Sequence, residues 1–394
     1  MLPYGGFEGN AQSLRILSRV EKKRTEGAPG VEFENGRDLR HGLNVTCRSL
    51  ASVLKYDSKI PVRDKGAQVS KGYYASEAQL VSNLKKAILG VDQIPEEYKR
   101  PRKFKTIECQ IMDIADDIAY STYDFEDAMK ADFSSLLDLL RIPQRKDLWR
   151  RVAFKVWKST QSAPVTFDEK TVPAQLESEI RAEEERVRAF LFVFCAGLIP
   201  SESQLGTVIP TAEELRKAID DLGMQPLDDA EQDQMVRNLG VLGFGFNSAE
   251  RLRESGYLRS SLTSDLVHQY IQAIRFRYNE RYPAVSAVWL EDKLRRQIEI
   301  LKHYTYEAHV EAARMQTIEY RGREIVTAIF KHLADDRKNR LMPEDWRDRT
   351  EGLADERHRR RCISDFIAGM TDRYAVEFYN RLTSGASATI FKDV

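Results

Sequence analysis

The 394-residue chain lacks the features that define several common classes of protein. Its four cysteines lie far apart with no C-x-x-C pair, which argues against a disulfide scaffold or a zinc ribbon and favours reduced thiols in a cytoplasmic protein. The longest apolar run, residues 189–200, is far shorter than the roughly 20 residues that a membrane span needs. No basic segment followed by an apolar stretch occurs near Met1, so a signal peptide is not indicated.

The chain also lacks an excess of charge of either sign and the short motifs of common nucleotide and metal sites. Lys plus Arg and Asp plus Glu both number 61, so the formal net charge is zero and nucleic-acid binding is not indicated. Neither G-x-x-x-x-G-K-[ST] nor G-x-G-x-x-G occurs, and there is no G-x-S-x-G elbow. The six histidines form no H-E-x-x-H motif, and none is followed by Asp. The sequence therefore does not indicate a phosphate-binding loop, a serine hydrolase or a zincin protease.

Apolar residues recur instead at the spacing of helices. Between Leu43 and Leu54 they fall at i, i+4, i+7 and i+11, which places them on one helical face. A longer helix is predicted from Thr106 to about residue 131, with apolar side chains along one side. Strand-like alternation is scarce, so the sequence predicts an all-α fold with at most minor β-structure.

The long helix predicted from Thr106 carries an acidic stripe. Its members share one face because they fall at i, i+3, i+7, i+11 and i+14. They are Asp113, Asp116, Tyr120, Asp124 and Asp127, with no Lys or Arg between them. Since like charges on adjacent turns repel, the stripe requires a cation, either a metal ion or facing basic side chains. The alternative is a solvated acidic face that binds nothing.

The most specific motifs are FEGNAQSLRIL (residues 7–17), QIMDIADDIAYSTYDFEDA (110–128) and DFIAGMTDRYAVEFYNRL (365–382). All three closely resemble the HD-domain deoxynucleotide triphosphohydrolases, the dGTPase-like proteins. The resemblance implies an all-α fold with an HD-domain-type helical core and a C-terminal helical region. It divides the chain into part of the catalytic domain (1–154), a helical insert or linker region (155–252) and a C-terminal helical region that completes the fold (253–394).

The resemblance also implies a reaction and a set of site residues. Members of the family hydrolyse a deoxynucleoside triphosphate (dNTP) to a deoxynucleoside and triphosphate with Mg²⁺ or Mn²⁺ bound. It assigns Asp116 as a metal ligand, Tyr120 as the residue beside the sugar and phosphates, and Asp124 as the acceptor for the 3′-hydroxyl. Arg259, in GYLRSSLTSDLV, is a further candidate for a phosphate contact. The implied partners are a dNTP, with dGTP favoured, and further copies of the chain in a homo-oligomer.

One departure from the family pattern bears on activity. In the family a His, a His-Asp pair and the catalytic His and Glu precede the FEGNAQ segment, which begins here at Phe7. The sequence is therefore predicted to be an N-terminally truncated member without a catalytic His/Glu pair, in which Asp116 is the one recognisable metal ligand. We expect it to hydrolyse dNTPs negligibly alone. Two alternatives stay open: a non-catalytic nucleotide-binding partner or regulatory subunit of a dNTPase oligomer, and a purely structural helical protein.

Overall fold

The computed structural model of the chain describes residues 4–26, 32–34, 37–62, 69–99, 103–130, 146–161, 165, 167–197, 254–310, 313–336, 340–351 and 355–383. The chain divides into two compact units, which are described separately. Unit 1 contains Met1–Asp113, Phe276–Trp289 and Thr317–Val394. Unit 2 contains Ile114–Arg275 and Leu290–Gln316. The division falls within helix α5 (Ile107–Lys130) and within helix α13 (Ala313–Asp335).

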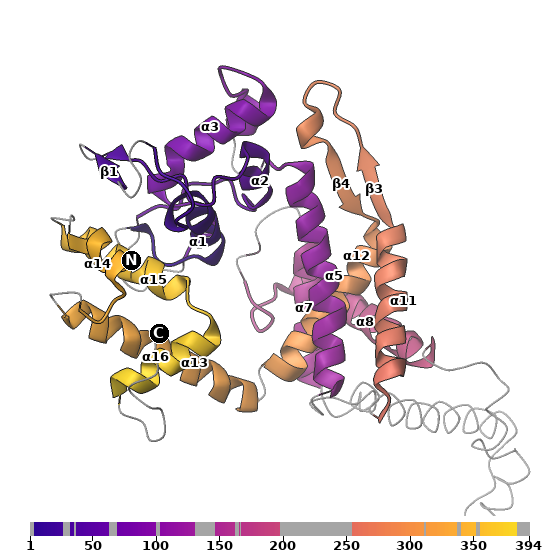
Figure 1. The fold of residues 1–394 in the computed structure, drawn as a ribbon. Helices are drawn as coiled ribbons and strands as arrows, with labels where there is room; N and C mark the ends of the chain where they lie inside the picture. The colour runs from indigo at the N-terminus through magenta and orange to yellow at the C-terminus, as the bar shows by residue number, and fades with distance from the viewer. Residues whose placement is uncertain are drawn as a thin grey trace, which may run out of the picture. The chain divides into compact units, whose positions relative to one another are not determined.

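Unit 1 is formed by short helices from both ends of the sequence (Figure 1). Its N-terminal elements are α1 (Gly9–Arg15), the π-helix η2 (Ile16–Val20), β1 (Phe33–Glu34), β2 (Arg37–Asp38), α2 (Cys47–Ser52), the 3₁₀ helix η3 (Ala75–Glu77), α3 (Ala78–Leu89) and α4 (Glu96–Lys99). Its later elements are the 3₁₀ helix η7 (Pro283–Val285), most of α13, α14 (Glu344–Glu351), α15 (Glu356–Ala368) and α16 (Asp372–Thr383). Strands β1 and β2 pair antiparallel, with Phe33 opposite Asp38.

The apolar faces of these helices form two main cores in unit 1. One joins Leu14 of α1 to Leu50 of α2 and Leu84 of α3. The other joins α13, α15 and α16 through Ile329, Phe366 and Phe378 and the residues around them. Burial of such side chains is the main stabilising term, at about 1.5–3 kcal/mol for each large apolar side chain.

Unit 2 is a set of longer helices. They are the greater part of α5, α7 (Lys146–Thr160), α8 (Glu177–Gly197), α11 (Gly256–Gln272) and α12 (Asp292–Thr305), with the 3₁₀ helix η5 (Ala174–Leu176) and the π-helix η8 (Tyr306–Val310). Its central core includes Phe125, Trp149 and Leu301, and Trp149 stacks on Tyr304 at 5.8 Å between ring centroids. A second two-stranded sheet, β3 (Ile274–Arg277) with β4 (Ala287–Leu290), follows α11 in the chain, and both of its strands are divided between the two units.

The prediction of an all-α fold with minor β-structure is confirmed for the described residues, where strands occur only in these two small sheets. The helix predicted around Leu43–Leu54 is shorter than its periodicity indicates, because Thr46 caps it by accepting a hydrogen bond from the Ser49 backbone N–H. Residues 198–253, most of the predicted insert, lie outside the described ranges, and the three-part division stays a prediction. No described helix combines the length and apolarity needed to cross a bilayer.

Candidate functional site

Helix α5 places the acidic stripe opposite its own buried face. Thr106 caps the helix, because its hydroxyl accepts a hydrogen bond from the Cys109 N–H at 3.3 Å. Ile118 and Phe125 are buried, at 6% and 2% exposure, on the core side of the helix. Asp116 is half-buried, whereas Tyr120 is 50% exposed and Asp124 is exposed. The three residues that the resemblance assigns to ligand binding therefore share an accessible face of one helix.

The first carboxylate of the stripe is already neutralised by basic side chains. Asp113 forms an ion pair with Lys55 at 3.0 Å and a second one with Lys105. Both lysines come from other parts of unit 1, which explains why the helix sequence alone looks unbalanced. For Asp113, the facing basic side chains predicted as one alternative are present, and the residue is not available as a free ligand.

The remaining carboxylates of the stripe repel one another. The pKa of Asp124 lies above its ordinary value because of partial burial and because of the negative charges of Asp127 and Asp116. Each of these residues is one or two turns from Asp124 on the same helix. Such repulsion lowers the stability of the helix and would be relieved by a bound positive charge or by a hydrogen-bond donor that Asp124 accepts.

A polar cluster on α12 contacts α5 at Asp117, the residue after Asp116. Lys302 donates to Asp117 at 3.1 Å and to Glu299 at 2.7 Å. Glu299 also pairs with His303 at 3.1 Å. Burial alone would raise the pKa of Glu299, but hydrogen bonds from His303 and Lys302, with their positive charges, lower it to about 2. Asp117, the neighbour of the predicted metal ligand, is thus held to α12 by the ammonium group of Lys302, which also binds Glu299.

This cluster predicts an acid-sensitive contribution to stability. The pKa of Glu299 falls from its ordinary 4.5 to about 2, so its contribution is complete above pH 4.5 and is lost as the pH falls through 2. The shift corresponds to about 3 kcal/mol at neutral pH. We expect Glu299→Gln to be less stable than wild type by about that amount at pH 6 and no less stable near pH 2, as followed by urea unfolding at each pH. A difference that does not change with pH would contradict this assignment.

The fourth predicted site residue, Arg259, lies on α11, which runs antiparallel to α5 (Figure 1). Thr263 of α11 donates to Glu126 of α5 at 2.6 Å, whereas Tyr270 shares a buried cluster with Ile118. Since Arg259 is one turn before Thr263, the register places it beside the last turns of α5. It therefore lies towards the Asp124 end of the stripe and not beside Asp116.

The described residues do not provide the ligand set of a Mg²⁺ or Mn²⁺ site. Within the described ranges, no three His, Cys, Asp or Glu side chains are grouped so that they could hold a metal ion. Two histidines have other partners, since His303 pairs with Glu299 at 3.1 Å and His41 with Glu26 at 3.4 Å. Hard cations of this kind need several oxygen ligands, and Asp116 offers one carboxylate. These residues therefore do not fit a complete site of their own.

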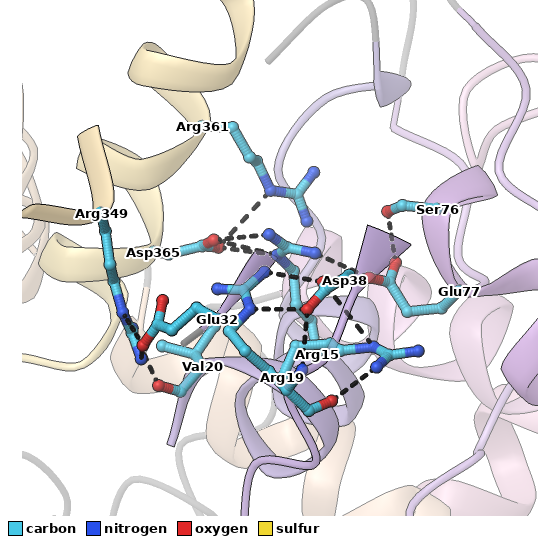
Figure 2. Close-up of polar contacts among 11 residues, drawn as sticks. Arg15, Arg19, Val20, Glu32, Asp38, Ser76, Glu77, Arg349, Arg361 and Asp365 are labelled. Carbon is cyan, nitrogen blue, oxygen red and sulfur yellow. Dashed lines mark hydrogen bonds and ion pairs between the residues drawn. The ribbon is translucent and has the colours of Figure 1, made fainter. Parts of the chain in front are cut away.

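Unit 1 contains a buried ionic network that the sequence did not predict (Figure 2). Arg15 of α1 donates to both carboxylate oxygens of Asp365 on α15, at 2.8–3.0 Å. It also donates to Glu77 of η3 at 2.7 Å. Gln12 adds a hydrogen bond to Asp365 at 2.8 Å. We call these four residues the Arg15 network.

The Arg15 network is nearly excluded from water. The side chains of Arg15, Glu77 and Asp365 are 10%, 2% and 1% exposed. Burial alone would raise the pKa of Asp365, but the charge and hydrogen bonds of Arg15, with the charge of Arg361 and the Gln12 amide, hold it below its ordinary value. Asp365 is thus ionised, and its charge is paired with that of Arg15 rather than solvated.

The Arg15 network connects segments that the resemblance identified only as sequence patterns. FEGNAQSLRIL contributes Gln12 and Arg15, and DFIAGMTDRYAVEFYNRL contributes Asp365. Glu77 joins them from η3. One signal was available in the sequence, because Gln12 and Arg15 accompany Ala11 and Leu14 on a short apolar helix. Their partners lie 62 and 350 residues from Arg15 along the chain, so local spacing could not indicate them.

A family model described as phosphohydrolase-associated domain matches residues 288–381. The chain is 36% identical over 395 residues to deoxyguanosinetriphosphate triphosphohydrolase-like protein 2 of Mesorhizobium japonicum, covering 100% of this chain and 75% of that protein. It is 26% identical to a deoxyguanosinetriphosphate triphosphohydrolase-like protein of Aliivibrio fischeri, covering 97% of this chain and 71% of the relative. A protein of the same description from Histophilus somni is 23% identical, covering 97% of this chain and 69% of the relative.

Proposed function

The chain belongs to the deoxyguanosinetriphosphate triphosphohydrolase-like family, and we propose that it binds a dNTP along the accessible face of α5. The observation that carries the proposal is the position of Asp116, Tyr120 and Asp124 on one face, opposite the buried Ile118 and Phe125. The reaction to which this binding belongs is hydrolysis of the dNTP to a deoxynucleoside and triphosphate. Mg²⁺ or Mn²⁺ would supply the electrostatic stabilisation of the phosphate charge.

Each residue of this face has a chemical role suited to its type. The phenol ring of Tyr120, half exposed, offers a flat apolar surface against which a sugar can pack. Asp124 can accept a hydrogen bond from the 3′-hydroxyl, which would also relieve its repulsion from Asp127 and Asp116. Asp116 is proposed as one metal ligand among several. Arg259 as a phosphate contact stays a prediction, and its register places it nearer Asp124 than Asp116.

We further propose that this chain hydrolyses dNTPs negligibly on its own. No His in the sequence is followed by Asp, and the described residues hold no cluster of three metal ligands. The same observation favours a second candidate function, a nucleotide-binding partner or regulatory subunit in an oligomer whose other chains supply the metal site. The proposal also includes dGTP as the favoured nucleotide, assembly into a homo-oligomer and a cytoplasmic location. The names of the relatives support the first of these, the nucleotide.

Binding of dGTP with and without its 3′-hydroxyl tests the role of Asp124. A hydrogen bond to an ionised group contributes enough free energy that its loss weakens binding by about 10- to 100-fold. By thermal shift or calorimetry with Mg²⁺, we expect wild type to bind dGTP that much more tightly than 2′,3′-dideoxyGTP. Asp124→Asn should lose most of this preference.

Asp127→Asn is the matched control, because it makes the same charge change one turn further along α5. It should keep the preference for the 3′-hydroxyl. Equal preferences in wild type and Asp124→Asn would remove Asp124 from the proposed site. No dNTP-dependent shift at all would favour a purely structural protein with a solvated acidic face.

A further inference from the structure

Helix α15 carries two buried arginines with opposite surroundings. Arg359 donates its guanidinium hydrogens to backbone carbonyls at the end of α13, namely those of Leu333 at 2.9 Å, Ala334 at 3.0 Å and Asp336 at 2.7 Å. These carbonyls lack intrahelical donors, so Arg359 completes the hydrogen bonding of a helix terminus. Its role is structural, and its hydrogen-bonding capacity is used within the protein.

Arg361, two residues further on, is also buried, but its terminal nitrogens donate no hydrogen bond to any described residue. Its side chain is 4% exposed, and its Nε lies 3.4 Å from the nearer oxygen of Asp365. Asp365 is already engaged at shorter distances by Arg15 and Gln12. Nη1 and Nη2 of Arg361 find no hydrogen-bond acceptor in the described part of the chain. Both point away from Asp365 (Figure 2).

Two tyrosine rings form the walls around this guanidinium. The ring centroid of Tyr74 lies 3.9 Å from the Cζ atom of Arg361, and that of Tyr4 lies 4.8 Å away. Tyr74 is fully buried, whereas Tyr4 is half-buried and forms the outer wall. Aromatic rings stabilise the charge of an arginine through their π-faces but accept none of its in-plane hydrogens. The Nη1–Nη2 edge therefore remains a two-pronged donor.

Such a donor needs an acceptor. A buried ionised group that lacks hydrogen bonds is among the most costly features of a folded protein, because it has lost its hydration shell without replacement. Glu77 does not act as this acceptor, because its two carboxylate oxygens already accept hydrogen bonds from Arg15 and Ser76. A planar guanidinium with both terminal nitrogens free matches the spacing of two oxygens of a phosphate group.

We propose that Arg361 is the centre of an oxyanion-binding site that takes a phosphate group between Nη1 and Nη2, with Tyr4 as its outer wall. All of its residues belong to unit 1, whereas Tyr120, Asp124 and Arg259 belong to unit 2. The site is independent of the proposed dNTP-binding face, and either can be absent without affecting the other. The ligand is a free phosphate or the terminal phosphate of a small metabolite.

Thermal unfolding of the full chain with inorganic phosphate tests the proposal. Sodium chloride at matched ionic strength removes the general effect of salt. In wild type we expect a saturable rise in Tm, of about 2 °C at ten times the dissociation constant. Arg361→Gln should abolish the rise. Arg359→Lys is the matched control from the same helix, which is expected to lower the basal Tm and to keep the phosphate-dependent rise.

The remaining outcomes also decide the proposal. A wild-type Tm that follows ionic strength alone would mean that the site holds only water and would overturn it, as would a rise that persists in Arg361→Gln. If Arg361→Gln does not fold, equilibrium dialysis of radiolabelled phosphate against wild type and Tyr4→Ala replaces it, with at least a fivefold weaker binding expected for Tyr4→Ala. Acetate in place of phosphate tests the oxyanion class, and a response to acetate without one to phosphate would contradict the phosphate assignment. Glucose 6-phosphate against inorganic phosphate separates a metabolite from the free ion.

Discussion

Asp365→Ala should lower the free energy of unfolding of unit 1 by about 3–5 kcal/mol, because it leaves a buried arginine without its counter-charge. The side chains of Arg15 and Asp365 are 10% and 1% exposed, and they share three hydrogen bonds at 2.8–3.0 Å. Removing the carboxylate also takes away the acceptor of Gln12. Hydrogen exchange measured on peptides from α1 and α15 reports this loss for unit 1 alone.

Arg373→Ala is the control for this prediction. Arg373 pairs with Glu377 at 3.1 Å one turn away, but its side chain is 84% exposed. Exposed pairs of this kind contribute little, so the change in stability should stay within about 0.5 kcal/mol. The double variant Arg15→Met/Asp365→Ala should lose less than the sum of the single losses, because the second substitution removes the charge that the first leaves unpaired. Additive losses would contradict a direct coupling of Arg15 with Asp365.

The ionisation of Asp365 gives the same prediction a pH dependence. Its pKa in the folded chain lies below the ordinary value of 3.8. Its contribution is therefore fully present above pH 3.8 and is lost as the pH falls through the lower, folded value. The difference in stability between wild type and Asp365→Ala should shrink under acid conditions and stay constant from pH 5 to pH 8.

We also expect a very low rate of catalysis. The purified 394-residue chain should release triphosphate from dGTP at least about a thousandfold more slowly than the 1–10³ s⁻¹ of typical enzymes, with Mg²⁺ or with Mn²⁺. The rate is expected to be low because too few metal ligands are present. The described residues include no group of three side chains that could hold a metal ion, and no His in the sequence is followed by Asp. Anion-exchange chromatography of the products, calibrated with added triphosphate, measures the rate.

A binding measurement on the same protein shows whether the α5 face holds a nucleotide without catalysis. A chain that binds dGTP and does not hydrolyse it agrees with the proposed nucleotide face and an incomplete metal site. Rapid metal-dependent release of triphosphate would show that the chain holds a complete metal site. It would overturn the predicted inactivity and leave the assignment of the α5 face intact.

Local features of the fold could be predicted from the sequence. The expected helix from Thr106 to about residue 131 agrees with α5 (Ile107–Lys130), because its limits depend on a cap and on helical periodicity. The common face of Asp116, Tyr120 and Asp124 follows from spacing alone. The late start of α2 did not follow, because the hydroxyl of Thr46 overrides an apolar pattern that begins at Leu43.

Long-range pairing could not be predicted. The lysines that neutralise Asp113 lie 58 and 8 residues away along the chain, and only the fold brings both to it. The antiparallel register of α11 and α5, which sets the position of Arg259, depends on tertiary packing. The Arg15 network is the least predictable of these pairings, because no sequence pattern indicates which Arg, Glu and Asp form ion pairs.

Hydroxyl-radical footprinting shows whether a dNTP lies along the accessible face of α5, as we propose. Tyr120 on this face is 50% exposed, and Tyr278, which lies outside α5, is 60% exposed, so both react readily in the free chain. With saturating dGTP and Mg²⁺, we expect the oxidation rate of Tyr120 to fall at least about threefold, since ring burial removes its accessible surface, while that of Tyr278 stays unchanged. An unchanged rate at Tyr120, under conditions where calorimetry detects bound dGTP, would place the nucleotide elsewhere and contradict the proposed binding along α5.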